Sequence, residues 1–377
     1  MKIAIVHDYL NQYGGAERVL EVIHQIWPEA PIFTSLIDYQ KMEKQGFNFK
    51  GKDIRTSFMQ KLPFRKSLAN SYYLPLYPLA FEKFDLTGFD VVLSLTSFAA
   101  KGVITKPETT HICYCCTPTR HLWHSQEYLS HHSHVKGIHK PLLYPILNYL
   151  RIWDLVAASR VDYFLTISKA VQRRLKRIYH REAEVIYPPV NLTRFLKLKL
   201  LKTDSKKGFF LIVSRLGGHK RVDLAIEAFN RLKLPLKIIG DGPQEKRYRK
   251  MAGQNIEILG RLPDERVDYF YQNCLGFIYP QEEDFGITAL EAQAAGKPVI
   301  AFKKGGALET IIEGQTGIFF EQQTVPDLTA AINQFHRLNF NPEKCRAQAR
   351  NFSEEKFRQA IKSSVEKLYD QRQRKSG

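Results

Sequence analysis

The amino-acid sequence predicts an α/β protein with two Rossmann-like domains, each built around a mostly parallel sheet. Short apolar runs alternate with amphipathic stretches along most of the 377 residues, which is typical of parallel strands joined by crossover helices. The alternation is interrupted by a Lys-rich polar stretch near residue 200 and then starts again. A chain of this length accommodates two domains of roughly 150–200 residues, each with its own core.

Each expected strand is a short run rich in aliphatic, β-branched and aromatic residues, bounded by polar or glycine-containing turns. In the first half, strands are expected at residues 2–7, 31–36, 90–95, 111–116, 163–168 and 182–191. In the second half, they are expected at residues 209–216, 236–242, 255–262, 275–280 and 298–302.

These elements divide the chain into four parts. We predict an N-terminal domain over residues 1–190, a linker over 191–207 and a C-terminal domain over 208–352. Residues 353–377 have a helical pattern. It begins with an imperfect capping box, because Lys356 stands where Glu or Gln is usual. This helix could pack back on the N-terminal domain.

Cysteine content and hydropathy indicate a protein of a reducing compartment. No apolar run approaches the roughly 20 residues that span a bilayer, and the first residues read as a buried strand rather than a signal peptide. The five cysteines are odd in number and irregularly spaced, which favours free thiols. We expect a cytoplasmic protein, either free or peripheral on the inner face of the membrane.

The net charge is +18, and both halves share it. Such an excess attracts polyanions, anionic lipid surfaces and phosphorylated substrates alike. The densest basic segment runs into the aromatic stretch SYYLPLYPLAFEKF, so residues 41–84 suit an anionic membrane surface. A solvated loop beside a core helix explains them equally well. We expect no nucleic-acid partner, because no RNA-recognition, KH or zinc-finger signature is present.

A pair of cations follows the first expected strand of the second half. In VSRLGGHKRVDLAIEAF, Arg215 ends the strand and Lys220 comes five residues later, just before a helix. A strand, a glycine turn and a helix N-terminus form an anion site, and two cations suit a diphosphate. The stretches IGDGP and LGRLPDE end further strands in tight turns, which could simply connect each strand to the helix that follows.

The stretch QEEDFGITALEAQAAG places two glutamates around a Phe-Gly turn. Glu283 lies in the expected loop and Glu291 in the first turn of the helix that follows. The amides of Phe285, Gly286 and Ile287 would point outward, where the helix dipole places a partial positive charge. Amides for an anion beside carboxylates that accept from hydroxyls describe a sugar-phosphate site. The spacing of Thr288 and Glu291 also matches a capping box, and the spacing alone leaves both roles of Glu291 open.

Several of these motifs together resemble a known family. The block VSRLGGHKRVDLAIEAFNRL, IIGDGP, LGRLPDERV and YPQEEDFGITALEAQAAGKPVIAFKKGGALETI looks like the C-terminal half of the retaining glycosyltransferases of family 4 (the group 1 transferases), which have the GT-B fold. HDYLNQYGGAERVL and HICYCCTPTRHLW are similar to the N-terminal half of its polysaccharide-assembly mannosyl- and glucosyltransferases. The resemblance therefore implies two Rossmann-like domains that face a central crevice. The domain of residues 1–190 would bind the acceptor, and the domain of residues 208–352 would bind the nucleotide sugar.

The resemblance also implies roles for individual residues. The expected catalytic residues are His111 near the reacting centre, Arg215 and Lys220 on the donor diphosphate, and Glu283 on hydroxyls of the transferred sugar. Glu291 would accept from the ribose hydroxyls. The remaining donor- or acceptor-binding candidates are Gly14, Gly15, Arg120, Arg261, Leu262, Asp284, Phe285, Gly286 and Ile287. The loop departs from the commoner Glu-Gly-Phe-Gly, because Asp284 replaces the first glycine.

The implied activity is the transfer of a hexose from a nucleotide-diphosphate sugar to a glycan or lipid-linked acceptor, with retention of configuration. UDP-glucose is the favoured donor; a GDP-mannose-dependent mannosyltransferase and, further off, a sugar-nucleotide epimerase are the alternatives. A glycan phosphorylase would need a pyridoxal-binding lysine and a much longer chain. We expect no cofactor and no metal, because Arg215 and Lys220 stand where a divalent ion would. The HHSHVKGIH loop and the CYCC cluster match no structural zinc spacing.

Overall fold

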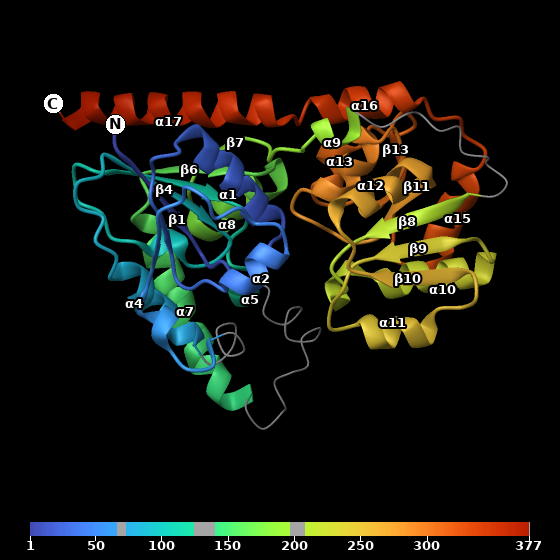
Figure 1. The fold of residues 1–377 in the computed structure, drawn as a ribbon, viewed down its shortest axis with the longest axis horizontal. Helices are drawn as coiled ribbons and strands as arrows, with labels where there is room; N and C mark the ends of the chain where they lie inside the picture. Colours follow the sequence, from blue (N-terminus) through green and yellow to red (C-terminus); the bar gives the residue numbers. More distant parts are fainter. Residues whose placement is uncertain (66–72, 124–139, 197–207, 377) are drawn as a thin grey trace. The chain divides into compact units, whose positions relative to one another are not determined.

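The computed structural model describes residues 1–65, 73–123, 140–196 and 208–376. It divides the chain into two compact units, one of Met1–Tyr187 with Phe357–Gly377 and one of Pro188–Lys356. Each unit is an α/β layer structure around one parallel sheet (Figure 1). Most of the predicted linker, residues 197–207, lies outside the described residues.

The N-terminal unit contains a seven-stranded sheet in the order β3-β2-β1-β4-β5-β6-β7. All of its pairings are parallel. In chain order the strands are β1 (Ile3–His7), β2 (Ile32–Thr34), β3 (Ile54–Thr56), β4 (Val91–Thr96), β5 (Thr110–Cys115), β6 (Tyr163–Thr166) and β7 (Ala183–Val185). The central strands β1, β4 and β5 are buried throughout, as their unbroken apolar runs predict.

Helices connect these strands and cover the sheet. The α-helices are α1 (Gly15–Ile26), α2 (Tyr39–Lys44), α4 (Tyr77–Glu82), α5 (Arg120–Trp123), α7 (Lys140–Ser159) and α8 (Lys169–Tyr179). Short 3-10 turns are η1 (Phe58–Lys61), η2 (Leu74–Leu76) and η3 (Ala100–Gly102).

The last helix, α17 (Glu354–Ser376), packs on the N-terminal unit from Phe357 onward. Ser364 Oγ donates to Glu184 Oε1 over 2.8 Å, and the Arg372 guanidinium pairs with Asp162. Figure 1 shows α17 (red) running along one side of this unit.

The C-terminal unit contains a six-stranded sheet in the order β10-β9-β8-β11-β12-β13, and all of its pairings are parallel. The strands are β8 (Phe209–Val213), β9 (Leu236–Ile239), β10 (Ile256–Gly260), β11 (Cys274–Tyr279), β12 (Val299–Phe302) and β13 (Gly317–Phe320). The helices are α9 (Thr193–Leu196), η5 (Gly218–Lys220), α10 (Val222–Leu232), α11 (Glu245–Met251), α12 (Asp264–Asn273), α13 (Ile287–Ala294), α14 (Ala307–Thr310), α15 (Val325–Phe335) and α16 (Pro342–Arg350).

Two aspects of the structure were not apparent in the sequence. The edge strands β3 and β13 are additional to the predicted ones, and α9 begins at Thr193 within the predicted linker. The aromatic part of residues 41–84 belongs largely to the core: Tyr77 and Phe81 of α4 are fully buried, whereas Phe64 is 77% exposed. The explanation by a core helix therefore holds for α4.

Candidate active site

The strand order of the C-terminal unit creates a topological switch point between β8 and β11. From β8 the chain proceeds outward through β9 and β10, and from β11 it proceeds in the opposite direction through β12 and β13. The loops after β8 and β11 therefore diverge, and ligands of open parallel sheets bind where such loops part, outside the carboxyl ends of the strands. Lys220 follows β8 and Glu283 follows β11, so both predicted residues lie at this point.

The Lys220 ammonium and the Glu283 carboxylate contact one another across the switch point. Both side chains are about one-fifth exposed. A second link ties the same loops, because Arg221 Nη1 donates to Gln323 Oε1 over 3.3 Å and Gln323 Nε2 donates to the carbonyl of Pro280 over 2.8 Å. A cation and a carboxylate that belong to segments 63 residues apart are thus held at one place.

The glycines of IGDGP allow two loops to pack backbone to backbone. A Cβ at Gly240 would lie 1.9 Å from the carbonyl oxygen of Ser214, and one at Gly242 would lie 2.6 Å from that of Leu216. Both glycines also have positive φ angles, which other residues adopt only with strain. IGDGP therefore supports the loop that carries Arg215, in addition to ending β9. Arg215 is exposed, two residues after β8.

The Phe-Gly turn sets the start of α13. Phe285 is buried and stacks edge-on against Phe352, with ring centroids 5.6 Å apart. Gly286 is the N-cap residue with φ +99°, and a Cβ there would lie 2.5 Å from the Tyr279 hydroxyl. The first amides of a helix have no partner within the helix and carry the positive end of its dipole. Gly286 and Ile287 thus lie at the positive end of α13, at the switch point, and their binding of an anion stays a prediction.

Gly305 and Gly306 pack directly against the loop that carries Glu283. The amide of Gly306 donates to the carbonyl of Glu283 over 2.8 Å. A Cβ at Gly305 would lie 2.2 Å from that same carbonyl oxygen, and one at Gly306 would lie 2.3 Å from the Cα of Phe285. The sequence signal was the glycine pair in FKKGG, directly after β12, which sequence reasoning did not assign to the site.

The structure decides one of the two alternatives for Glu291. Because Gly286 is the N-cap of α13, Glu291 is the fifth residue of the helix, beyond the third position that a capping box requires. Its Oε2 accepts from the Tyr271 hydroxyl over 3.0 Å, and its Oε1 lies 3.5 Å from Arg194 Nη1. Glu291 is therefore held by side chains of other elements, and its contact with a ribose stays a prediction.

Arg194 of α9 was missed by the sequence reasoning. Its guanidinium contacts Asp268 at 2.5 Å and Asp264 at 3.2 Å, besides Glu291. Hydrogen bonding to Asp268 and the neighbouring carboxylates raise the pKa of Arg194 despite its burial. Nothing in the sequence identified it, because it lies in the stretch that was assigned to the linker.

The other predicted residues of this unit are placed less centrally. Arg261 is exposed just after β10, which is two strands from β8 in the sheet. Leu262 is half-buried and packs on the core formed around β11 and α12. Asp284 is buried beside Phe285. The structure therefore brings Lys220, Glu283 and the α13 N-terminus together at the switch point. Arg261 and Leu262 follow β10, two strands away from β8.

In the N-terminal unit, Gly14 and Gly15 begin α1, after β1. The Gly14 amide donates to Glu17 Oε2 over 2.8 Å, which satisfies one amide of the helix N-terminus, and Gly15 is exposed. Asp8, which sequence reasoning did not single out, joins the loops after β1 and β4. It is buried and accepts from the amides of Ser97 and Ala99, at 2.7 and 2.8 Å, among others.

Arg120 begins α5 after β5, and one buried carboxylate positions its neighbours. Asp154 of α7 accepts from Thr119 Oγ1 at 2.8 Å and from Trp123 Nε1 at 2.7 Å. It also accepts from the ammonium of Lys101, at 2.6 Å, and the hydroxyl of Tyr179, at 2.7 Å. Arg120 itself is half-buried. The bonds of Thr119 and Trp123 fix the short segment that carries Arg120, after β5.

His111 lies in the interior of the N-terminal sheet. His111 is the second residue of β5, so about 13 Å of strand separates it from the carboxyl end, at roughly 3.3 Å per residue. It is buried, and its Nε2 lies 2.9 Å from Ser94 Oγ. Burial lowers its pKa to about 3. His111 is thus a buried residue of the sheet, and its predicted place near the reacting centre stays a prediction.

This environment makes a prediction for pH. Because the folded-state pKa of His111 lies below the unfolded value, the unfolded chain binds more protons between about pH 6.5 and 3. The stability that neutral His111 contributes is complete above pH 6.5 and falls at lower pH, by up to about 1.4 kcal/mol per pH unit. We expect the melting temperature of His111→Gln to fall less than that of the wild type between pH 7.5 and 5. Parallel losses, or a 100-fold loss of activity in a folded variant at pH 7.5, would contradict this assignment.

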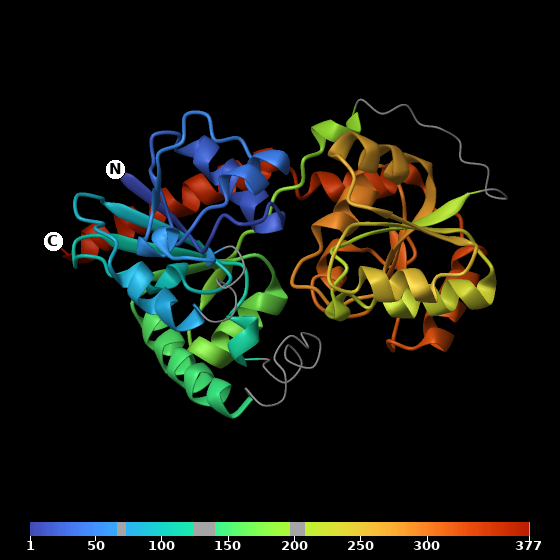
Figure 2. The same cartoon turned by 60° about the horizontal axis from the view of Figure 1, so that its bottom comes forward.

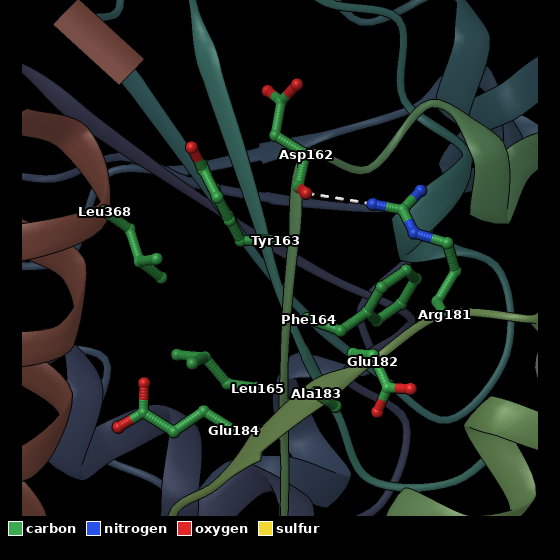
Figure 3. A pocket seen from close by; sticks show the side chains of 9 residues that line it. All are labelled: Asp162, Tyr163, Phe164, Leu165, Arg181, Glu182, Ala183, Glu184 and Leu368. Atoms are coloured by element: carbon green, nitrogen blue, oxygen red, sulfur yellow. Dashed lines mark hydrogen bonds between the residues drawn. The ribbon is translucent and has the colours of Figure 1, made fainter. Parts of the chain in front are cut away.

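A pocket of about 450 Å³ lies elsewhere, between β6, β7 and α17 of the N-terminal unit. Figure 3 shows Leu165, Glu184 and Leu368 around this space, with the Arg181 guanidinium directed at the carbonyl of Asp162, 2.9 Å away. Arg181 also donates to the carbonyl of Val161 and lies over the Phe164 ring. These contacts of Arg181 stabilise the fold of the unit. The pocket does not lie at the carboxyl ends of the strands.

All five cysteines are free thiols. Within the described ranges, no three His, Cys, Asp or Glu side chains gather in a way that could hold a metal ion. The histidines of HHSHVKGIH fall at residues 131–139, outside the described residues.

Comparison with known proteins identifies a family for part of the chain. Residues 196–352, less than half of its length, match the model described as Glycosyl transferases group 1. The uncharacterized glycosyltransferase MJ1178 of Methanocaldococcus jannaschii is 30% identical over 227 residues, which are 57% of this chain and 62% of that protein. The alpha-1,3/1,6-mannosyltransferase ALG2 of Dictyostelium discoideum is 31% identical over 233 residues, which are 49% of this chain and 55% of that protein. The chain therefore aligns with little more than half of each relative.

Solved structures match the fold over almost the whole chain. The lipopolysaccharide outer core galactosyltransferase WaaB has a TM-score of 0.67 at 19% identity, covering 97% of this chain and 99% of that one. The Anabaena protein HepE, in complex with UDP and glucose, has a TM-score of 0.69 at 17% identity with the same coverage. The predicted GT-B fold is confirmed, and residues 196–352 match the group 1 glycosyl transferases, in agreement with the prediction of a hexosyltransferase.

Proposed function

We propose that the protein is a retaining hexosyltransferase whose nucleotide-sugar donor binds at the switch point of the C-terminal unit. The observation that supports this most is the contact of Lys220 with Glu283 beside the N-terminus of α13. A cation and helix amides suit the diphosphate, and a carboxylate suits the hydroxyls of the sugar. The family match over residues 196–352 covers all of these groups.

In the proposed reaction, the bond between the anomeric carbon and the diphosphate oxygen breaks while the acceptor oxygen bonds to the same face of that carbon. The acceptor proton passes to the departing phosphate. Arg215, Lys220 and the amides of Gly286 and Ile287 stabilise the negative charge that develops on the leaving group. Glu283 orients the sugar and Glu291 the ribose. No step requires a metal ion, because these groups supply the positive charge.

UDP-glucose is the donor we propose, with GDP-mannose as the alternative. The first follows from the resemblance to polysaccharide-assembly glucosyltransferases, and UDP and glucose occupy the HepE structure of the same fold. The second is favoured by the mannosyltransferase name of a 31% identical relative. We propose a glycan or lipid-linked acceptor, with basic residues of 41–65 available to an anionic membrane surface.

Calorimetric titration of UDP, GDP, UDP-glucose and GDP-mannose, each with EDTA present, tests the proposal. We expect one base to bind at micromolar strength without metal, and its sugar nucleotide to bind at the same site. Binding that requires Mg²⁺ would contradict metal independence. Absence of binding by all four compounds, with and without Mg²⁺, would contradict the donor site itself.

A further inference from the structure

The outer face of α7 is largely apolar although it is exposed, and the exposed polar residues among its described ones are Asn148 and Ser159. Tyr144, Tyr149, Ile152, Leu155 and Val156 are each between 41% and 60% exposed. The last four recur at the three- and four-residue spacing of one broad helix face, and Tyr144, 11 residues before Leu155, falls on the same face. Figures 1 and 2 both show α7 (green) along the outer side of the N-terminal unit.

The opposite face of α7 accounts for its packing. Leu147, Leu150 and Trp153 are buried, and Trp153 Nε1 donates to Glu82 Oε1 of α4 over 2.9 Å. The described acidic residue of α7, Asp154, is also buried, in the hydrogen-bond cluster beside Arg120. The exposed apolar residues are therefore surplus to the core of the unit. Monomeric proteins seldom keep a contiguous apolar face of this kind unless it contacts a partner.

The helix beside α7 is strongly basic. The α8 residue Tyr179 donates to Asp154 of α7, which fixes the two helices side by side. The sequence of α8, KAVQRRLKRIY, contains five Lys and Arg and no acidic residue. Lys169, Arg173 and Arg177 are exposed on it.

We propose that this α7–α8 surface, defined as the outer face of α7 and the exposed cations of α8, binds a bilayer that contains anionic lipids. Tyrosine and aliphatic side chains enter the boundary between headgroups and acyl chains, and each nearby Lys or Arg is attracted to the anionic surface. A second copy of this chain fits less well, because it would bring two basic α8 helices and two net charges of +18 together. In the described residues no helix is long and apolar enough to cross a bilayer, so the contact is peripheral.

The proposal goes beyond donor binding, because it gives the protein a second binding surface, for an anionic bilayer. It agrees with a lipid-linked acceptor but uses no residue of the donor site. Its test is therefore made without nucleotide, so that it and the donor proposal can fail separately.

The test is flotation of the full chain with phosphatidylcholine vesicles, with and without 30% phosphatidylglycerol, at about 0.15 M salt. We expect binding to the anionic vesicles alone. The double variant Ile152→Ser/Val156→Ser should bind at least tenfold more weakly, because both side chains would otherwise leave water. Its control is Ile312→Ser/Leu338→Ser, which removes two similarly exposed apolar side chains from the C-terminal unit and should bind normally.

The charge is tested in the same way. Arg173→Gln/Arg177→Gln should weaken binding about tenfold, whereas Arg249→Gln/Lys250→Gln on α11, with the same change in net charge, should have little effect. Equal binding of all variants, or no binding by the wild type, would overturn the proposal. A wild-type dimer in light scattering that Ile152→Ser/Val156→Ser converts to monomer would also overturn it, in favour of self-association.

Discussion

Replacing Lys220 with alanine is expected to weaken binding of the nucleoside diphosphate about 100-fold. A hydrogen bond to a charged group contributes about 1.5–3 kcal/mol, and the substitution also leaves Glu283 beside the diphosphate without the cation that it contacts. Turnover at saturating donor should fall by a further factor of about 100, because the charge on the leaving group grows in the transition state. Calorimetry and initial rates measure the two losses.

Two variants make this result specific. Lys250→Ala removes the same charge from an exposed position in the last turn of α11, and it should leave both quantities within about twofold. Glu283→Gln should keep or improve UDP binding, because Lys220 is released from its carboxylate partner, and should lower turnover of the sugar nucleotide. If Glu283→Gln weakened UDP as strongly as Lys220→Ala, the division of roles between phosphate and sugar would be wrong.

Gly305→Ala is expected to destabilise the C-terminal unit and to inactivate the protein. Alanine at φ +63° costs about 1–2 kcal/mol, and its Cβ would lie 2.2 Å from the carbonyl oxygen of Glu283, which adds about 1–3 kcal/mol of overpacking. The melting temperature of this unit should fall by about 5–15 °C. Activity should fall further than the folded fraction does, because the displaced loop carries Glu283.

Gly314→Ala is the matched control. Gly314 has φ +74°, and no atom lies within 4 Å of the position of its Cβ. The control therefore includes the backbone strain without the collision, and it should lower the melting temperature by only a few degrees, about 2–8 °C, and leave activity intact. Equal effects at residues 305 and 314 would show that the contact with the Glu283 loop has no importance.

The central strands and the contact of Lys220 with Glu283 were largely predictable. Unbroken apolar runs identified β1, β4 and β5, since a strand that is buried on both faces carries no polar alternation. The rule that carboxyl ends of parallel strands share one edge was enough to expect Lys220 near Glu283. The edge strand β3 escaped because its three residues, Ile54–Thr56, are only partly buried and carry no apolar run.

Other features depend on three-dimensional information that the sequence does not display. Whether Glu291 takes part in a capping box depends on which residue starts α13. The left-handed conformation of Gly286 at the N-cap decides this, and the sequence does not display it. His111 could be located only from the register of β5, which puts it opposite Val92 near the start of the strand. The link from Arg194 to Glu291 joins elements separated by almost 100 residues, with no local pattern to mark it.

The four hydrogen bonds of Asp154 limit which residues can replace it during evolution. One carboxylate serves four donors, on Lys101, Thr119, Trp123 and Tyr179. Asparagine has a single acceptor oxygen and would turn an NH₂ group toward some of those donors. Glutamate would add a methylene to a filled interior. Neither replacement therefore keeps all four bonds at position 154, whereas the exposed residues 152, 155 and 156 of the same helix are constrained only by the bilayer contact that we propose.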